Sequence, residues 1–390
     1  MELALYCPVY GYYEKEGDTV GRQGDFYTSV SVGPLFGKLL AVQFAEWLPT
    51  MSVAPSRPVT KASGPGAESL QLVEAGAHRG ELAKDILHWF RDFCPALFER
   101  LEYWIIEPSD RRQKWQKEFL AGFPNTVKWA KSLTRFEQPT GPVDLLSPAR
   151  LCASTSRETL HNLSIPRIIF CNELLDAMPV HRWRWEANRR TWVEWGVTLK
   201  GEQFVWAPMS ETPETAHSEF WNPLLAPNFS YSAALLEVLP DGFIVETSPA
   251  AAKWFQEASR LAGVGKIVTI DYGFTREEQV APERLQGSLR AYRNHHLRPD
   301  PLASPGNQDL TAAVDFTTLQ HCGESAGLRT EAFLTQEQFL TCIAARLWKR
   351  ELPFEEWTPR HTRHFQTLTN PEHLGRSFRV LIMAAPGLEN

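Results

Sequence analysis

The sequence predicts an α/β protein built on a mostly parallel sheet, and two observations support this prediction. The first is a strand–turn–helix unit: an apolar run from Leu70 closes on Glu74, a glycine turn follows, and apolar side chains then recur at helical spacing from about Gly80. The second is a series of further short apolar runs that end in acidic or amide side chains, with helix-length segments between them. Strands and helices that alternate in this way are typical of a parallel sheet.

The turn after the first strand contains Gly76 and Gly80. We expect Gly76 to take backbone angles closed to other residues, and Gly80 to let the helix approach the strand. A unit of this kind opens many nucleotide-binding folds. Glu74 would repel a pyrophosphate, whereas it suits a ligand with a cationic end, such as the amino-acid portion of S-adenosylmethionine (SAM). An ordinary strand–turn–helix of any α/β core explains the same pattern, so both interpretations stay open.

The remaining core elements follow in chain order. After the first strand we expect strands at 103–107, 126–129, 167–171, 266–271, 288–293 and 377–383, and helices that begin near residues 80, 109, 249, 315 and 335. Glu107 ends the second strand, where an acid bonds the ribose hydroxyls in dinucleotide folds. Its separation from Gly76 is longer than the roughly 20 residues that are typical there.

The fourth strand leads into three acceptor-rich side chains, Asn172, Glu173 and Asp176. Ligands of open parallel sheets bind outside the carboxyl ends of the strands, so these side chains are candidates for the site of chemistry. The alternative is a capped helix start, with Asn or Asp as the N-cap.

Residues 181–241 are predicted to be an insertion beside the parallel core. Trp183 and Trp185 precede a turn at 188–190, and Trp192 and Trp195 follow it, so the segment begins with a tryptophan-rich hairpin. Clusters of this kind serve packing more often than recognition, and partner binding is the alternative.

Composition indicates a soluble globular protein of 390 residues, with 43% hydrophobic and 22% charged residues. The formal net charge of −6 gives no field that favours nucleic acid. No apolar run reaches transmembrane length, and the N-terminus resembles neither a secretory signal nor an organelle presequence. The six cysteines are scattered without a C-x-x-C pair, which argues against a zinc site and for reduced thiols in the cytoplasm.

Several motifs occur together and in order along the chain: Gly11-Tyr12-Tyr13, Gly24-Asp25-Phe26-Tyr27-Thr28, Pro34-Leu35-Phe36-Gly37, Val73-Glu74-Ala75-Gly76, Asn172-Glu173-Leu174-Leu175-Asp176-Ala177-Met178-Pro179, Asp271-Tyr272-Gly273, Asp309-Leu310-Thr311 and Val314-Asp315-Phe316. This pattern resembles the MidA-like family of SAM-dependent methyltransferases. The resemblance implies a class I methyltransferase fold, Rossmann-like, with a mostly parallel seven-stranded sheet, helices on both faces and extra segments beside it. Mitochondrial members of the family are protein arginine methyltransferases that assist assembly of respiratory complex I. An arginine-bearing subunit of the NADH:quinone oxidoreductase is therefore the expected partner, with symmetric dimethylarginine as the product.

The resemblance and the strand ends together define the expected site. For SAM, we assign Glu74 and Gly76 to the amino-acid end and Glu107 to the ribose. His78, Gly80 and Asn172 are further expected cofactor contacts, and the resemblance implies that the loop Gly24, Asp25 and Phe26 folds over the site. An arginine guanidinium is cationic, so carboxylates must orient it. Glu173 and Asp176, with Asn172, are the expected catalytic residues, and Asp271 and His295 are expected to bind the substrate. A hydrogen-bonded structural histidine is the alternative for His295. No metal is expected.

Two departures from the family pattern bear on activity. The family reads Gly-Pro-Gly-Arg-Gly at the anchor turn, whereas this chain has His78 in place of a glycine beside the expected cofactor. The chain also begins at a point that matches the interior of the family's N-terminal region; either a leading helix is missing or the start is placed late, and a mitochondrial location is then the alternative to the cytoplasm. A catalytically silent assembly chaperone is the alternative function, and a methyltransferase of a small molecule is a third.

The predicted organisation is a single methyltransferase domain, 1–390. Its parts are a lead-in and covering loop at 1–48, a Rossmann-like core at 70–180 and 242–274, the insertion at 181–241 and a C-terminal part at 288–384 that completes the sheet.

Overall fold

The computed structural model describes residues 1–15, 28–51, 69–136, 165–209, 231–294 and 296–386. Contacts within the chain group into two compact units. Unit 1 comprises Met1–Ser31, Glu173–Phe255 and Asp271–Cys322, and unit 2 comprises Val32–Asn172, Gln256–Ile270 and Gly323–Asn390. The chain therefore passes from one unit to the other several times.

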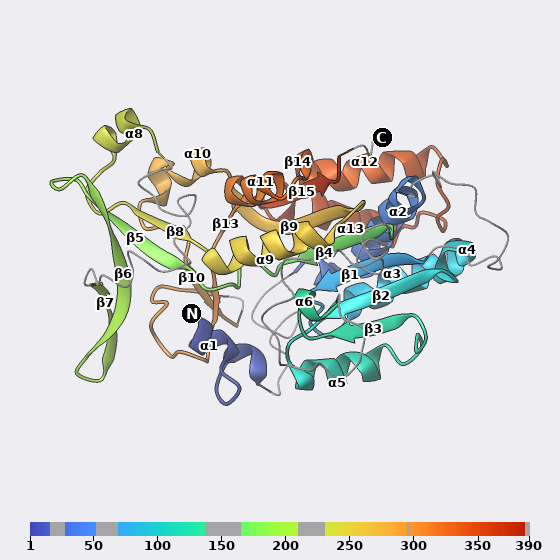
Figure 1. The fold of residues 1–390 in the computed structure, drawn as a ribbon, viewed down its shortest axis with the longest axis horizontal. Coiled ribbons are helices and arrows are strands. Elements are labelled where there is room, and N and C mark those ends of the chain that lie inside the picture. Colours follow the sequence, from blue (N-terminus) through green and yellow to red (C-terminus); the bar gives the residue numbers. More distant parts are fainter. Residues whose placement is uncertain (16–27, 52–68, 137–164, 210–230, 295, 387–390) are drawn as a thin grey trace, which may run out of the picture. The chain divides into compact units, whose positions relative to one another are not determined.

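Unit 2 is built on the predicted sheet (Figure 1). Its strands are β1 (Leu70–Ala75), β2 (Leu101–Ile106), β3 (Val127–Ala130), β4 (Arg167–Asn172), β9 (Lys266–Phe274), β14 (Arg329–Thr335) and β15 (Phe378–Ala384). Strand β9 begins in unit 2 and ends in unit 1, which includes its residues from Asp271 on. They lie in the order β14-β15-β9-β4-β1-β2-β3. Pairing is parallel from β3 through β2, β1 and β4 to β9, and β14 pairs antiparallel with β15. In chain order, the sheet reads 3-2-1-4-5-7-6.

The helices of unit 2 are α2 (Leu35–Thr50), α3 (Glu81–Phe93), α4 (Pro95–Phe98), α5 (Asp110–Phe119), α6 (Leu133–Phe136), α12 (Gln336–Trp348), α13 (Pro359–Thr369) and α14 (Leu374–Ser377). Three of them, α3, α5 and α12, begin where the sequence predicts, and the shorter helices α4, α6 and α14 and the helix α13 were not predicted. Ser109 caps α5 by accepting the Arg112 N–H, and Thr335 and Gln338 form the predicted capping box of α12. Local sequence signals therefore fix the start of each of these two helices.

Unit 1 contains the tryptophan-rich hairpin. Strands β5 (His181–Glu186), β6 (Thr191–Lys200), β7 (Gln203–Pro208) and β8 (Ile244–Thr247) form an antiparallel sheet in the order β7-β6-β5-β8. Trp185 and Trp192 are buried with Leu239, Phe243 and Val245, so these two tryptophans are core residues. The sequence placed residues 242–247 in the parallel core. That assignment is wrong, because β8 pairs antiparallel with β5.

The rest of unit 1 consists of short elements. They are α1 (Glu2–Tyr6), η1 (Tyr12–Glu14), η2 (Val30–Val32), α8 (Ala233–Val238), α10 (Arg276–Gln279), η6 (Pro282–Arg284), β10 (Arg290–Arg293), β11 (His296–Arg298), β12 (Asp309–Thr311) and β13 (Val314–Asp315). Strands β10, β11 and β12 form a small antiparallel sheet, and Leu5 and Tyr12 pack against Ala291 and Leu310. The predicted strand at 288–293 is therefore present as β10, but its assignment to the core sheet is wrong. Helices α9 (Pro249–Leu261) and α11 (Phe316–Ser325) begin in unit 1 and end in unit 2.

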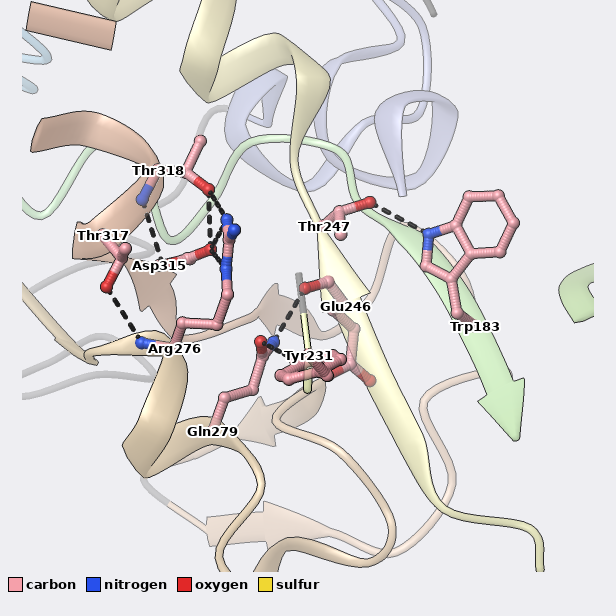
Figure 2. Close-up of polar contacts among 9 residues, drawn as sticks. All are labelled: Trp183, Tyr231, Glu246, Thr247, Arg276, Gln279, Asp315, Thr317 and Thr318. Atoms are coloured by element: carbon pink, nitrogen blue, oxygen red, sulfur yellow. Dashed lines mark hydrogen bonds and ion pairs between the residues drawn. The ribbon is translucent and has the colours of Figure 1, made fainter. Parts of the chain in front are cut away.

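Side-chain hydrogen bonds join the elements of unit 1 around β8 (Figure 2). The indole N–H of Trp183 on β5 donates to Thr247 Oγ1 at 3.0 Å. On the other side of β8, Gln279 Nε2 donates to the Glu246 carbonyl at 3.0 Å, and Gln279 Oε1 accepts from the Tyr231 hydroxyl at 2.8 Å. These bonds tie β8 both to its own sheet and to α10.

Arg276 links α10 to the start of α11 in the same view (Figure 2). Its Nη2 lies 2.9 Å from Asp315 Oδ2, and its backbone N–H donates to Thr317 Oγ1 at 3.0 Å. Asp315 Oδ1 also accepts the backbone N–H of Thr318, as expected of an N-cap. The predicted helix start near residue 315 is thus confirmed.

Among the described residues, no helix combines the length and the apolar character needed to cross a membrane. The search of the same residues found no group of three or more His, Cys, Asp or Glu side chains that could hold a metal ion.

Candidate active site

The turn after β1 has the backbone that the sequence predicts. Gly76 has φ +80° and Gly80 has φ +95°, in the left-handed region that favours glycine. A Cβ on Gly80 would lie 3.0 Å from Leu120 Cδ1, so side-chain packing favours glycine there as well. His78 lies between them with φ +46°, a conformation uncommon for residues other than glycine.

Glu74, the acid before this turn, points into the interior of unit 2. Its side chain is buried, with the residue only 2% exposed, and Oε2 accepts a 2.6 Å hydrogen bond from the Tyr103 hydroxyl on β2. Burial raises the pKa of Glu74 to about 8, although the Tyr103 bond opposes the shift. A cation brought close to Glu74 would favour its ionised form. The sequence analysis missed Tyr103, because its partner comes from a neighbouring strand.

Glu107 directly follows β2 and is also buried. Its Oε1 lies 3.1 Å from Arg112 Nε and accepts the Ser109 N–H at 2.9 Å. Gln113 donates to its backbone carbonyl at 2.8 Å. The first turn of α5 therefore holds the acid at the end of β2.

Gln116 on α5 connects this acid with the glycine turn. Its amide nitrogen donates to the His78 carbonyl at 2.9 Å and lies 3.3 Å from Glu107 Oε2. Its amide oxygen accepts the Trp129 indole N–H at 3.0 Å. This role could not be predicted from the sequence, since a glutamine inside a polar helix is expected to face solvent.

The geometry at the ends of β1 and β2 fits a nucleotide that carries a cationic amino-acid group. The left-handed glycines leave the turn without side chains at two positions, and buried acids lie at the end of β1 and just beyond β2. An acid at the end of β1 would repel a pyrophosphate, whereas it attracts the cationic amino-acid end of SAM. The residues present therefore suit SAM better than a pyrophosphate.

A second set of predicted residues lies in unit 1, immediately after β4. Glu173 has φ +52°, uncommon for a residue with a side chain, and its Oε1 accepts the backbone N–H of buried Ser29 at 3.1 Å. Asp176 is 5% exposed, and its Oδ1 has no hydrogen-bond partner among the described residues. Burial, followed by the charges of Asp271 and Asp309, raises the pKa of Asp176 well above its usual range.

Asp271 lies in β9 and is fully buried. Its Oδ2 accepts backbone N–H groups of Leu174, Leu175 and Asp176 at 3.3, 2.9 and 3.4 Å. Its Oδ1 accepts the Tyr272 N–H at 2.9 Å. Burial and the Glu173 carboxylate raise the pKa of Asp271 to about 8, and the amide hydrogen bonds oppose that shift.

Asp309 completes the acidic cluster of unit 1. Its Oδ1 accepts a 2.8 Å hydrogen bond from the Tyr13 hydroxyl, and both belong to motifs that carried the resemblance. Burial is the main cause that raises the pKa of Tyr13 well above its usual range, so the hydroxyl keeps its proton at neutral pH. The sequence analysis assigned no role to either residue.

The structure therefore places the predicted residues in two groups. Unit 2 brings together Glu74, Gly76, His78, Gly80 and Glu107, and Asn172 is the buried last residue of its strand β4. Unit 1 brings together Glu173, Asp176 and Asp271. Gly24, Asp25, Phe26 and His295 lie outside the described residues.

The strand order 3-2-1-4-5-7-6, with a glycine turn after the first strand and an acid after the second, defines a class I SAM-dependent methyltransferase. Residues 39–334 match the family model described as "Putative S-adenosyl-L-methionine-dependent methyltransferase". The chain belongs to this family, the MidA-like methyltransferases, and its cofactor is SAM.

Relatives and solved structures agree with this assignment. "Protein arginine methyltransferase NDUFAF7, mitochondrial" of Danio rerio is 30% identical over 328 residues, which are 82% of this chain and 66% of that protein. The Drosophila melanogaster homologue is 25% identical over 98% of this chain and 80% of its own length. A Burkholderia thailandensis protein crystallised with S-adenosyl-homocysteine is 25% identical, with a TM-score of 0.74 over all of this chain and 87% of that one.

Proposed function

We propose that this methyltransferase modifies arginine side chains of a protein. The proposed product is symmetric dimethylarginine, and the proposed acceptor is a subunit of a complex I-type NADH:quinone oxidoreductase. The names of the NDUFAF7 relatives support arginine methylation, and the family resemblance suggests the acceptor and the product.

The observation that carries the proposal is the carboxyl cluster of unit 1. An arginine guanidinium stays cationic at any physiological pH and presents a planar set of N–H donors. Asp176 offers a buried oxygen with no hydrogen-bond partner among the described residues, and Glu173 holds its carboxylate in a fixed backbone conformation. A neutral acceptor would not require acids at this position, whereas a guanidinium needs them for binding and for orientation.

The two groups of residues would divide the work. Glu74 and Gly76 would hold the amino-acid end of SAM and Glu107 the ribose. His78, Gly80 and Asn172 would line the cofactor, with Gly24, Asp25 and Phe26 as further contacts. When bound, SAM supplies a methyl group made electrophilic by the sulfonium.

Glu173 and Asp176 would orient the guanidinium and localise its charge away from the attacking nitrogen. Alignment of the two reactants can supply much of the rate. The reaction also releases one proton from the guanidinium nitrogen. Asp176 is the proposed acceptor of this proton, because the approach of a cationic guanidinium would favour the ionised form of a carboxyl whose pKa burial raises.

The test is to incubate the purified chain with tritiated SAM and an extract from cells that lack it, and to search labelled proteins for methylated arginine by mass spectrometry. We expect label on arginine of one or a few proteins. Label confined to small molecules would contradict the proposal and favour the third alternative, a small-molecule methyltransferase.

A second candidate function is a catalytically silent chaperone that keeps the fold. His78 favours it, because a side chain with φ +46° stands in the turn where the family carries glycine. The His78→Gly variant separates the candidates: SAM binding that appears only in this variant would identify the native chain as a pseudoenzyme.

A further inference from the structure

Asp271 was expected to bind the substrate. In the structure, its carboxyl oxygens accept hydrogen bonds from backbone N–H groups. Its two carboxylate oxygens accept four backbone N–H groups, three of them from the consecutive residues Leu174, Leu175 and Asp176. The side chain is fully buried in unit 1. A carboxylate held in this way is poorly available to an incoming guanidinium.

The segment that Asp271 holds carries the two carboxyls of the proposed clamp. Glu173 begins it with φ +52°, a left-handed conformation that an L-residue keeps only where its surroundings impose it. The three N–H groups that follow Glu173 all point to one oxygen of Asp271. That convergence closes the backbone into a tight turn directly after the left-handed residue.

Other contacts fix the far end of the same segment. The Asp176 carbonyl accepts the Ala312 N–H at 2.9 Å, and the Ala177 carbonyl accepts the Tyr6 hydroxyl at 3.0 Å. Asp176 is thus bound through both its N–H and its carbonyl, while its Oδ1 makes no hydrogen bond within the part of the chain that the structure describes. Both backbone polar groups of this residue are therefore committed to the fold, whereas Oδ1 is not.

We infer that Asp271 is a positioning residue, which accepts the N–H groups of residues 174–176 and thereby holds the Glu173 and Asp176 carboxyls in place for the acceptor guanidinium. The part of this inference that concerns the guanidinium rests on the proposed function. The part that concerns the backbone does not.

The experiment compares the full-length chain with Asp271→Ala and Asp271→Asn. Asparagine keeps one carbonyl oxygen, which can still accept from residues 174–176, but its amide group cannot accept the Tyr272 N–H. Asp241→Asn is the matched control, because Asp241 is an exposed aspartate of the same unit that also accepts a backbone N–H, from Ala187. The measurements are amide hydrogen exchange of residues 173–178, SAM affinity by calorimetry, and methyl transfer to a synthetic glycine- and arginine-rich peptide.

In Asp271→Ala we expect exchange at residues 174–176 to accelerate at least tenfold and kcat for the peptide to fall about 100-fold, with the Kd for SAM within threefold of the wild type. Asp271→Asn should retain part of the amide protection and part of the kcat that Asp271→Ala loses. If the alanine variant fails to fold, the same measurements on the asparagine variant still test the inference. Asp241→Asn should change none of the three. Unchanged exchange in Asp271→Ala, or faster exchange with unchanged transfer, would overturn the inference.

The two proposals fail in different ways. A wild-type chain that binds SAM but transfers no methyl group to the peptide or to extract proteins contradicts arginine methylation. The exchange measurement then still decides the role of Asp271: protection lost in the alanine variant keeps it as the holder of this backbone, and protection retained removes it.

Discussion

The Tyr103 hydroxyl donates a 2.6 Å hydrogen bond to Glu74 Oε2, and both residues are buried between neighbouring strands of unit 2. This pair places a titratable carboxyl one residue before the end of β1, beside the turn that we assign to the cofactor. Because burial raises the pKa of Glu74 to about 8, the group is largely protonated at neutral pH until a cation approaches.

Glu74→Gln should weaken the pH dependence of stability. The Glu74 pKa rises from 4.5 in the unfolded chain to about 8 in the folded chain, so between these values the folded chain retains a proton that the unfolded chain releases. The free energy of unfolding therefore falls as the pH rises through this window. Urea denaturation at pH 5 and pH 8 should show a smaller difference for the variant than for the wild type. An equal difference would show that Glu74 titrates normally.

Gln116→Leu should weaken SAM binding by about tenfold or more, because it removes the hydrogen bonds to the His78 carbonyl and to Glu107 and leaves the Trp129 N–H without its acceptor. An unsatisfied buried group costs about 1–3 kcal/mol, so a loss of stability of that order should accompany the effect. Calorimetry and urea denaturation measure the two. Gln203→Leu, on the exposed strand β7, is the control. An unchanged SAM affinity in Gln116→Leu would show that Gln116 on α5 does not support cofactor binding.

His78→Gly should raise the affinity for SAM severalfold. Glycine takes φ +46° at no steric cost, and the change removes a ring beside the proposed amino-acid end. Calorimetric titration of both forms measures the effect. Lower affinity in the variant would show that the imidazole contributes a contact to the cofactor instead of crowding it.

Glu173→Gln should abolish methyl transfer to arginine and leave the Kd for SAM nearly unchanged, since the proposed role of this carboxylate is toward the acceptor. The amide still accepts the Ser29 N–H, so the loop contact survives the change. Tritium transfer and calorimetry report the two properties, with Glu202→Gln at an exposed turn as the control. A parallel loss of both would place Glu173 in the cofactor site.

The positions of six core strands, β1, β2, β3, β4, β9 and β15, could be predicted from the sequence, because short apolar runs mark each strand locally. Strand β14 was missed, and residues 288–293 were assigned to the core although β10 belongs to a small antiparallel sheet. The helix starts at Ser109 and Thr335 were predicted for the same reason, because a helix cap depends on residues that are close in the sequence. β8 was misplaced because a parallel core strand and a half-buried antiparallel strand have the same apolar composition over four residues.

The candidate site could be predicted only where local sequence marks it. Ligands of parallel sheets bind at the carboxyl ends of the strands, and the sequence places Gly76, Glu107 and Glu173 at or just after such ends. Gln116 and Tyr103 could not be found, because their partners lie on other elements and only the folded sheet brings them together. The backbone partners of Asp271 could not be predicted either, since the sequence does not show which N–H groups its oxygens accept.

Calorimetric titration of the full chain with SAM and with S-adenosyl-homocysteine tests the central claim most directly. The account predicts saturable binding of both ligands at one site, weakened by Gln116→Leu and preserved in Glu173→Gln. Absence of binding heat for both ligands at millimolar concentration, across several temperatures, would contradict the assignment of the glycine turn to a cofactor.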